Sequence, residues 1–376
     1  MNISVHDIAV EVIRTAGRDK PADQALREVL KAMRDLPPFD AAEVSRTVFN
    51  YYRWHGWLRE ERTVDARMRL ARRLAERSRA NTIPYAELRA KAVPAWTSEV
   101  LEVSDDWVKS LQKEPTLWLR AKRGMSAALL QSLPGADASN AWPDALVYAG
   151  ETDLFKTPEF HAGEFEIQDI ASQAVGWLCD PRPGETWWDT CAGEGGKLLH
   201  LSDLMQNKGL IWASDRAEWR LQKLKRRTAR VKAFNYRAAQ WDGGAKLPTK
   251  TKFDGILVDA PCSGLGTWQR NPHARWTTTL NDVRELAEVQ RRLLTNAAGS
   301  LKPGGKLIFA VCTLTRPETT EVVAHFNATQ TEFEPLPLPA LNANGHDFGS
   351  TPVVTLWPQD LNGNGMFIAG WRRKKT

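Results

Sequence analysis

Apolar side chains recur at helical spacing along the first part of the chain, in residues 5–16 and again in residues 26–33. Further on, Asp40 and Glu43 have the spacing of a capping box, which predicts that a third helix begins at Asp40. The pattern therefore predicts a compact, all-α domain over residues 1–98.

The pattern changes after this region. Residues 99–165 carry short apolar stretches broken by glycine and proline, which predicts a small connecting α/β subdomain. From residue 166 to residue 376, apolar runs alternate with amphipathic stretches, as is typical of a parallel sheet with crossover helices. The strands are expected at residues 186–189, 210–214, 231–236, 253–259, 306–311 and 366–372. The expected fold class is α/β, with an all-α domain in front.

Basic residues are concentrated in one predicted helix. The 376-residue chain has a net charge of +6, and the segment from Arg216 to Arg237 alone holds nine basic residues and one acid. Such a face suits a polyphosphate partner, because each neutralised phosphate releases counterions; on charge alone, a solvated helix face is the alternative. The apolar stripe of this helix is expected to pack on the sheet and to leave the basic residues outward for phosphates.

Other features of the sequence favour a cytoplasmic protein. No apolar run approaches the roughly 18 residues of a membrane span, and the segment Met1–Asp7 lacks the basic start and apolar stretch of a signal peptide. The four cysteines lie 12, 71 and 50 residues apart, which matches neither a metal-binding knuckle nor a dense disulfide framework. We therefore expect reduced thiols, no metal site and no membrane contact.

A glycine-rich loop follows the first predicted strand of the α/β region. Asp189 ends that strand, and the loop from Cys191 to Lys197 leads into a helix. Glycines at this point let the backbone approach a ligand closely, and Asp215 at the end of the next strand can grip ribose hydroxyls. Asp242, after the third strand, is placed to hold an adenine edge, with a plain Asp-Gly-Gly turn as the alternative. The arrangement predicts a nucleoside cofactor.

Two cysteines follow two other predicted strands. Cys262 comes three residues after Asp259, and Cys312 comes directly after the strand at 306–311. Because the carboxyl ends of parallel strands meet at one edge of a sheet, both thiols and the carboxylate are expected in one cleft. A lone cysteine at a strand end is more often a small buried residue, but two of them beside an acid weaken that interpretation.

A thiol suits an enzyme that must form and then break a covalent bond, because a thiolate attacks well and leaves easily. Carbon 5 of a pyrimidine is not nucleophilic by itself. Addition of a thiolate at carbon 6 converts the base to an enamine, whose carbon 5 can take a methyl group from a sulfonium donor. An acid at ring nitrogen 3 stabilises the developing charge, and a second thiol helps to remove the carbon-5 proton. Two cysteines and one acid match these needs.

Several motifs together resemble the Nop/Sun-type (RsmB-like) RNA cytosine-5 methyltransferases, whose bacterial members include a ribosomal RNA methyltransferase with a NusB-like N-terminal domain. The motifs are Glu166–Gln173, Cys191–Lys197, Asp259–Gly264, Arg270–Pro272, Lys302–Gly305 and Cys312-Thr313. A further likeness lies at Ser45–Trp54. The resemblance implies a Rossmann-like class I S-adenosylmethionine-dependent methyltransferase domain over residues 166–376, preceded by a NusB-like, RNA-binding domain. The chain departs from the family pattern at Gly193-Glu194, where Ala-Pro is common, and at Val311, where Thr is usual.

Carried over position by position, the resemblance implies a role for each reacting group. Cys312 is the nucleophile, and Cys262 assists product release. Asp259 contacts both the target base and the cofactor, and Lys197 lines the target pocket. The residues implied to bind S-adenosylmethionine are Cys191, Ala192, Gly193, Glu194, Gly195, Gly196, Lys197, Asp215, Arg220, Asp242 and Asp259.

The function expected from the sequence is RNA cytosine-5 methylation by a monomer, with ribosomal RNA favoured as the substrate and transfer RNA left open. One alternative is a DNA cytosine-5 methyltransferase with Cys262 as its sole nucleophile, against which Cys312 argues. The other is a non-catalytic RNA-binding or assembly factor, against which the intact Asp259, Cys262 and Cys312 argue.

Overall fold

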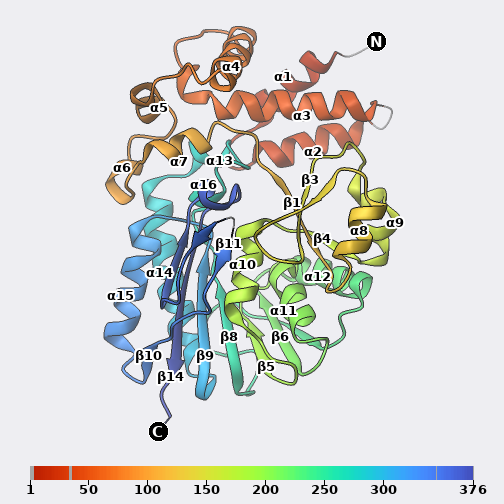
Figure 1. Cartoon of the computed structure of the whole chain (residues 1–376). Helices are drawn as coiled ribbons and strands as arrows, with labels where there is room; N and C mark the ends of the chain where they lie inside the picture. Colours follow the sequence, from red (N-terminus) through yellow and green to blue (C-terminus); the bar gives the residue numbers. More distant parts are fainter. Residues whose placement is uncertain (1–3, 34–35, 344, 376) are drawn as a thin grey trace. The chain divides into compact units, whose positions relative to one another are not determined.

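The computed structural model describes residues 4–33, 36–343 and 345–375, and its elements are drawn in Figure 1. Residues 1–3, which begin the segment that argued against a signal peptide, lie outside the described residues. The chain forms two compact units. The first comprises Met1–Pro115 with Thr267–Asp282, and the second comprises Thr116–Gly266 with Val283–Thr376.

The first unit is helical, as the apolar stripes predicted. Its α-helices are α1 (Val5–Thr15), α2 (Ala22–Ala32), α3 (Pro38–Arg53), α4 (Val64–Arg79), α5 (Tyr85–Lys91), α6 (Thr97–Val100), α7 (Asp105–Ser110) and α13 (Ala274–Thr277). The predicted start of the third helix at Asp40 is wrong, because α3 begins at Pro38, with Pro37 as its cap. Proline suits the first helical position, where its missing N–H would have no partner and its fixed φ already fits the helix.

A small antiparallel sheet opens the second unit. Its strands are β1 (Leu117–Ala121), β2 (Ala136–Ala138), β3 (Ala145–Tyr148) and β4 (Phe165–Ile167), in the order β2-β3-β1-β4. Helices α8 (Ser126–Ser132) and α9 (Pro158–Ala162) accompany it. Leu119, Leu146 and Phe165 are buried in its core. Residues 117–167 thus combine strands and helices, whereas residues 99–115, which the prediction placed in the same subdomain, belong to the first unit.

The main sheet is mostly parallel at its centre and antiparallel at one edge. The strands run β10-β14-β9-β8-β5-β6-β7, and β13 pairs with β14. Their bounds are β5 (Thr186–Asp189), β6 (Leu210–Asp215), β7 (Tyr236–Gln240), β8 (Phe253–Asp259), β9 (Leu301–Val311), β10 (Phe333–Pro335), β13 (Val353–Leu356) and β14 (Met366–Arg373). The five strands from β9 to β7 pair in parallel, so their carboxyl ends meet at one edge. This is the Rossmann-like α/β arrangement that the resemblance implied.

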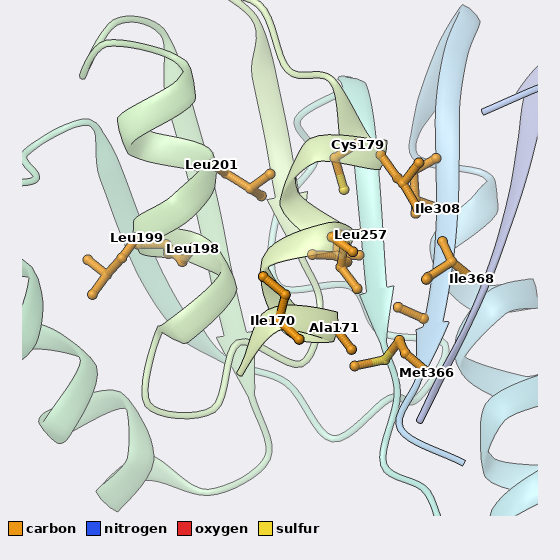
Figure 2. Packing of buried hydrophobic residues seen from close by; sticks show 14 of the residues in the cluster. Ile170, Ala171, Cys179, Leu198, Leu199, Leu201, Leu257, Ile308, Met366 and Ile368 are labelled. Atoms are coloured by element: carbon orange, nitrogen blue, oxygen red, sulfur yellow. The ribbon is translucent and has the colours of Figure 1, made fainter. Parts of the chain in front are cut away.

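Helices cover both faces of this sheet. The helices are α10 (Ile170–Cys179), α11 (Gly196–Leu204), α12 (Glu218–Val231), α14 (Leu280–Ala298), α15 (Thr320–Thr329) and α16 (Pro358–Leu361). Figure 2 shows one face, where α10 packs over Leu257, Ile308 and Ile368 of three neighbouring strands and α11 lies beside α10 in the same apolar cluster. On the other face, α14 and α15 pack against Trp188 and Phe309. A short β11–β12 pair (Asn342–Ala343 with His346–Asp347) completes the second unit.

Two predicted strands differ from the structure. The third strand, expected at residues 231–236, lies at Tyr236–Gln240, because α12 continues to Val231 and ends where Lys232 adopts a left-handed φ of +59°. The strand expected from residue 306 begins at Leu301, since its first residues pair with β8 through a register shift between Phe253 and Gly255. Hydrophobic periodicity alone shows neither where a helix ends nor whether a strand begins before an irregularity in its pairing.

Candidate active site

The glycine loop is fixed by two glycines with positive φ angles and by a backbone hydrogen bond to Asp215. Gly193 and Gly195 have φ angles of +54° and +92°, a region that L side chains rarely adopt. The N–H of Gly193 donates to Asp215 Oδ2 over 3.0 Å, and Asp215 Oδ1 accepts from the N–H of Ala217 over 2.8 Å. A Cβ added at Gly193 or Gly196 would meet open space, so the loop leaves room beside its backbone.

A cavity of about 420 Å³ lies at the carboxyl ends of the parallel strands, beside this loop. Of the residues expected to bind the cofactor, the cavity is lined by Cys191, Ala192, Gly193, Glu194, Gly196, Lys197, Asp215, Arg220, Asp242 and Asp259. Gly195 does not line it and instead caps α11. Asp242 Oδ1 also accepts from the N–H of Gly244 over 2.8 Å, so this residue both makes the local turn and faces the cavity. The structure therefore gathers ten of the eleven residues around one space.

Lys197 and Asp259 form an ion pair at the wall of the cavity. Lys197 Nζ lies 2.7 Å from Asp259 Oδ2, and the two side chains are 11% and 27% exposed. Burial disfavours the charged ammonium, but the charge and hydrogen bond of Asp259, together with the charges of Cys312 and Asp189, outweigh it and raise the pKa of Lys197 above its ordinary value. Lys197 therefore stays a cation.

The two thiols predicted from the strand ends lie together. Cys262 follows β8 and Cys312 follows β9, and their Sγ atoms are 3.2 Å apart, at hydrogen-bond distance. Both cysteines are free, as expected for reduced thiols. Neither cysteine lines the cavity, although Asp259, Ala260 and Pro261, which lead to Cys262, do.

The proton between the two sulfurs belongs on Cys262. A hydrogen bond from Cys262 lowers the pKa of Cys312 against the effects of burial and of the Asp259 charge, and the positive charge of Lys197 also lowers it. The same hydrogen bond, together with burial, raises the pKa of Cys262 well above its ordinary value. The hydrogen bond between the sulfurs therefore favours ionisation of Cys312 over ionisation of Cys262.

Two further groups near the site carry perturbed pKa values. Burial, with repulsion from Asp259, raises the pKa of Asp189 to about 8. Burial also raises the pKa of Cys191, so this cavity-lining thiol stays neutral. Sequence reasoning placed Asp189 only as the end of a strand and did not predict that its carboxyl would be buried.

Sequence reasoning also missed Glu318, which accepts hydrogen bonds from Ser263 beside Cys262 and from Thr313 beside Cys312. The signal that could have found it is the single hydroxyl residue directly after each cysteine, Ser263 and Thr313. Two hydroxyls at neighbouring strand ends suggest a shared acceptor.

The outer face of α12 differs in part from its prediction. Leu221, Leu224 and Thr228 are buried, as the apolar stripe predicted, and Lys225 and Arg226 are exposed. Arg227 and Arg230, however, do not point outward for phosphates. They form ion pairs with Glu166, whose side chain is 6% exposed. Lys223 Nζ lies 2.7 Å from Glu194 Oε1. Glu166, a buried carboxylate on β4, therefore binds two arginines that helical periodicity predicted to face solvent.

Metal-binding clusters and membrane-spanning helices are both absent from the described ranges. No group of three or more His, Cys, Asp or Glu residues is arranged to hold a metal ion there. None of the described helices is long and apolar enough to cross a membrane.

Solved and curated proteins are similar to this chain. A "Probable ribosomal RNA small subunit methyltransferase B" of Synechocystis sp. is 31% identical over 74% of this chain and 66% of its own length. A protein of the same name from Bacillus subtilis is 35% identical over 57% of this chain and 49% of its own. The chain thus spans between about half and two thirds of these relatives. The crystal structure of "PH0851" superposes with a TM-score of 0.79 at 22% identity and covers 99% of this chain and 100% of its own, which shows the shared fold.

The family model described as "16S rRNA methyltransferase RsmB/F" matches residues 176–372. This segment is more than half of the 376-residue chain and contains the glycine loop, the Lys197–Asp259 ion pair and both thiols. The chain belongs to the RsmB/F family of 16S rRNA methyltransferases.

Proposed function

We propose that this protein methylates carbon 5 of a cytosine in RNA, with Cys312 as the nucleophile and S-adenosylmethionine as the methyl donor. The observation that carries the proposal is the thiol pair. Two sulfurs 3.2 Å apart at neighbouring strand ends, beside a buried lysine cation and a carboxylate, suit a reaction that forms and then breaks a bond to carbon. The names of the relatives favour ribosomal RNA as the substrate.

The cavity fits an adenosine-containing cofactor. Asp215 at the end of β6 is placed to hold the ribose hydroxyls, and the glycine loop leaves its backbone free for close approach. Asp242 would hold the adenine edge, and Arg220 would close the ribose side. S-adenosylmethionine, when bound, supplies the methyl group as an electrophile. Asp259 and Lys197, which face the same cavity, would lie between the cofactor and the target base.

The protein's own groups would start the reaction. The thiolate sulfur of Cys312 adds to carbon 6 of the base and forms a carbon–sulfur bond, and the ring double bond supplies the electron pair that makes carbon 5 nucleophilic. Negative charge then develops on the ring. The ammonium of Lys197 would stabilise this charge, and Asp259 would act at ring nitrogen 3 as the neutral acid, donating a proton that it has taken up from solvent.

Product release would need a base for the carbon-5 proton. Cys262 lies 3.2 Å from the sulfur that holds the ring, so it is placed for this step once its own proton has passed to solvent. As the carbon-5 proton leaves, the ring double bond reforms, the carbon–sulfur bond breaks and Cys312 departs as a thiolate. A thiolate is a good leaving group, which suits the reversal of the first step.

Transfer assays with labelled S-adenosylmethionine would test the proposal. The purified chain is incubated separately with a 16S ribosomal RNA transcript, a transfer RNA pool and double-stranded DNA, and the product is sequenced after bisulfite treatment. Label at one cytosine of an RNA supports the proposal, and its distribution between the two RNAs identifies the substrate class. Label only in the DNA would favour the DNA methyltransferase alternative. Binding of RNA with no transfer to any substrate would favour the non-catalytic factor.

A further inference from the structure

Glu318 is a fully buried acid between the two loops that carry the thiols. It ends the short 3-10 turn Arg316–Glu318, and its side chain is 0% exposed. The cavity that we assign to the cofactor is not lined by it, and the chemistry proposed above does not use it. Its position therefore needs a separate explanation.

The carboxylate of Glu318 accepts five hydrogen bonds. Oε2 accepts from the hydroxyls of Ser263, of Thr313 over 3.1 Å and of Thr315 over 2.8 Å. Oε1 accepts from the backbone N–H of Ser263 over 2.8 Å and from Gln290 Nε2 over 3.1 Å. All five donors are neutral, so hydrogen bonds rather than an ion pair offset part of the cost of burying the charge, and burial still raises the pKa of Glu318 above its ordinary value.

These bonds join the two thiol-bearing loops. Ser263 is the neighbour of Cys262, and Thr313 is the neighbour of Cys312, so one carboxylate holds the residue next to each sulfur. The Ser263 and Thr313 hydroxyls also lie 2.9 Å apart. Gln290 of α14 adds a third anchor, because its Nε2 also donates to the carbonyl of Pro261 over 3.0 Å. The segment from Pro261 to Ser263 is thus held on both sides of Cys262.

We propose that Glu318 is a positioning residue that keeps Cys262 and Cys312 in register, so that both sulfurs reach the same pyrimidine ring. The inference rests on the proposed function, because it assigns one step of the reaction to each thiol. Orientation of this kind contributes strongly to rates, since reacting atoms must lie within a few tenths of an ångström of the productive distance. Glu318 would act through Ser263 and Thr313 and would not touch the substrate.

The charge of Glu318 acts on both thiols in the same direction. It disfavours a thiolate at either cysteine, and at Cys312 the hydrogen bond from Cys262 acts in the opposite direction. Two explanations of Glu318 therefore predict opposite results for a variant that lacks the charge. If Glu318 positions the two loops, its loss separates the sulfurs and slows their reaction with each other. If only its charge matters, its loss makes both thiols easier to ionise and more reactive.

The first experiment uses no RNA. The rate at which diamide oxidises Cys262 and Cys312 to a disulfide is measured by peptide mapping in the full chain and in Glu318→Gln. We expect the variant to form this disulfide about tenfold more slowly, because the two sulfurs no longer meet. Glu321→Gln, an exposed acid three residues on, removes the same charge and should match the unmodified chain. A faster rate in Glu318→Gln would overturn the positioning role and leave only the effect of charge.

A gentler variant keeps the test informative if Glu318→Gln folds poorly. Thr315→Val removes one hydroxyl donor to Glu318, keeps the carboxylate and preserves the shape of the side chain. It should slow disulfide formation about twofold to threefold, with unchanged affinity for S-adenosylmethionine by calorimetry. An unchanged disulfide rate together with a lower melting temperature in both variants would reduce Glu318 to a structural residue.

The second experiment adds the RNA. With Glu318→Gln, we expect the covalent protein–RNA adduct to form but to resolve about tenfold more slowly, because release needs Cys262 beside the ring. Equal loss of formation and resolution would contradict the inference. Failure of the unmodified chain to methylate any RNA would count against the proposed function alone, because the diamide experiment judges the position of Glu318 without a substrate.

Discussion

The cofactor cavity and the thiol pair meet at Lys197 and Asp259, yet they use their polar groups in opposite ways. In the cavity, Arg220 and Glu194 keep side-chain exposures of 44% and 40%, so each can still reach a ligand although it also lies beside an oppositely charged side chain. Around the thiols, Thr313, Thr315 and Glu318 are 0% exposed and bond to one another. The cavity is suited to bind a ligand, whereas the residues around the thiols fix the positions of the two sulfur atoms.

The difference teaches how to recognise the two kinds of site. A binding surface needs polar groups with spare hydrogen-bond capacity, because the ligand must replace the water that they lose. Reacting groups need a fixed distance and a fixed protonation state, which surrounding residues supply through completed hydrogen bonds. Substitutions in the cavity should therefore change affinity, and substitutions around the thiols should change individual reaction steps.

The largest expected effect separates the two thiols. Cys312→Ala should form no adduct and lose activity on the order of 10³-fold or more, because the enamine is never made. Cys262→Ala should still form the adduct and fail to resolve it, which traps protein on RNA. A denaturing gel after incubation with RNA and S-adenosylmethionine should show a slow, ribonuclease-sensitive band for Cys262→Ala alone. The reverse pattern would make Cys262 the nucleophile.

The next effect tests whether Lys197 belongs to both regions. Lys197→Met removes the positive charge that lowers the pKa of Cys312 and leaves Asp259 without its partner, and both changes raise that pKa. The thiolate fraction at neutral pH should therefore fall, with alkylation of Cys312 by iodoacetamide slowed about tenfold. The rate should recover as the pH is raised. An unshifted pH profile would mean that the hydrogen bond from Cys262 alone sets the ionisation of Cys312.

A smaller effect is expected in the cavity. Asp215→Ala removes the proposed ribose contact and the acceptor for the Gly193 N–H, so affinity for S-adenosylmethionine should fall by about 1–3 kcal/mol. Calorimetry measures this loss directly. Asp242→Ala is the matched comparison and should cost less, because Asp215 also fixes the glycine loop through the Gly193 N–H, whereas the bond from Gly244 to Asp242 stays within its own turn. Tight binding of a nicotinamide dinucleotide, with none of S-adenosylmethionine, would contradict the assignment of the cavity.

The smallest effect concerns the exposed face of α12. Lys225→Ser with Arg226→Ser should weaken RNA binding and lower the log–log salt slope by up to roughly two units, with unchanged melting temperature. Arg227→Ser provides the contrast, because it removes one of the two cations bound to the buried Glu166. That variant should lower the melting temperature. Equal salt slopes for the unmodified chain and the double variant would mean that this face is a solvated surface that does not contact phosphates.

Local patterns were sufficient for much of the fold. Strands β5 and β8 lie where the apolar runs placed them, and the glycine loop and Asp215 lie at strand ends as expected. The predictions were wrong at the ends of elements, where a cap or the preceding element determines the first residue. Helix α3 begins two residues before its predicted cap, and β7 begins where the prediction ended, because α12 continues to Val231. Helix ends are decided by caps and by packing as well as by periodicity.

The sequence by itself determined which residues could react, because a strand that ends in an acid or a cysteine delivers that side chain to a known edge of the sheet. Only the tertiary structure decided how these residues are coupled. The 3.2 Å between two sulfurs 50 positions apart, the bonds from Ser263 to Glu318 55 positions on, and the capture of Arg227 by Glu166 across 61 positions are contacts between distant segments. Periodicity reports which face of an element is apolar, but the partner that covers a polar side chain is chosen by how the elements pack.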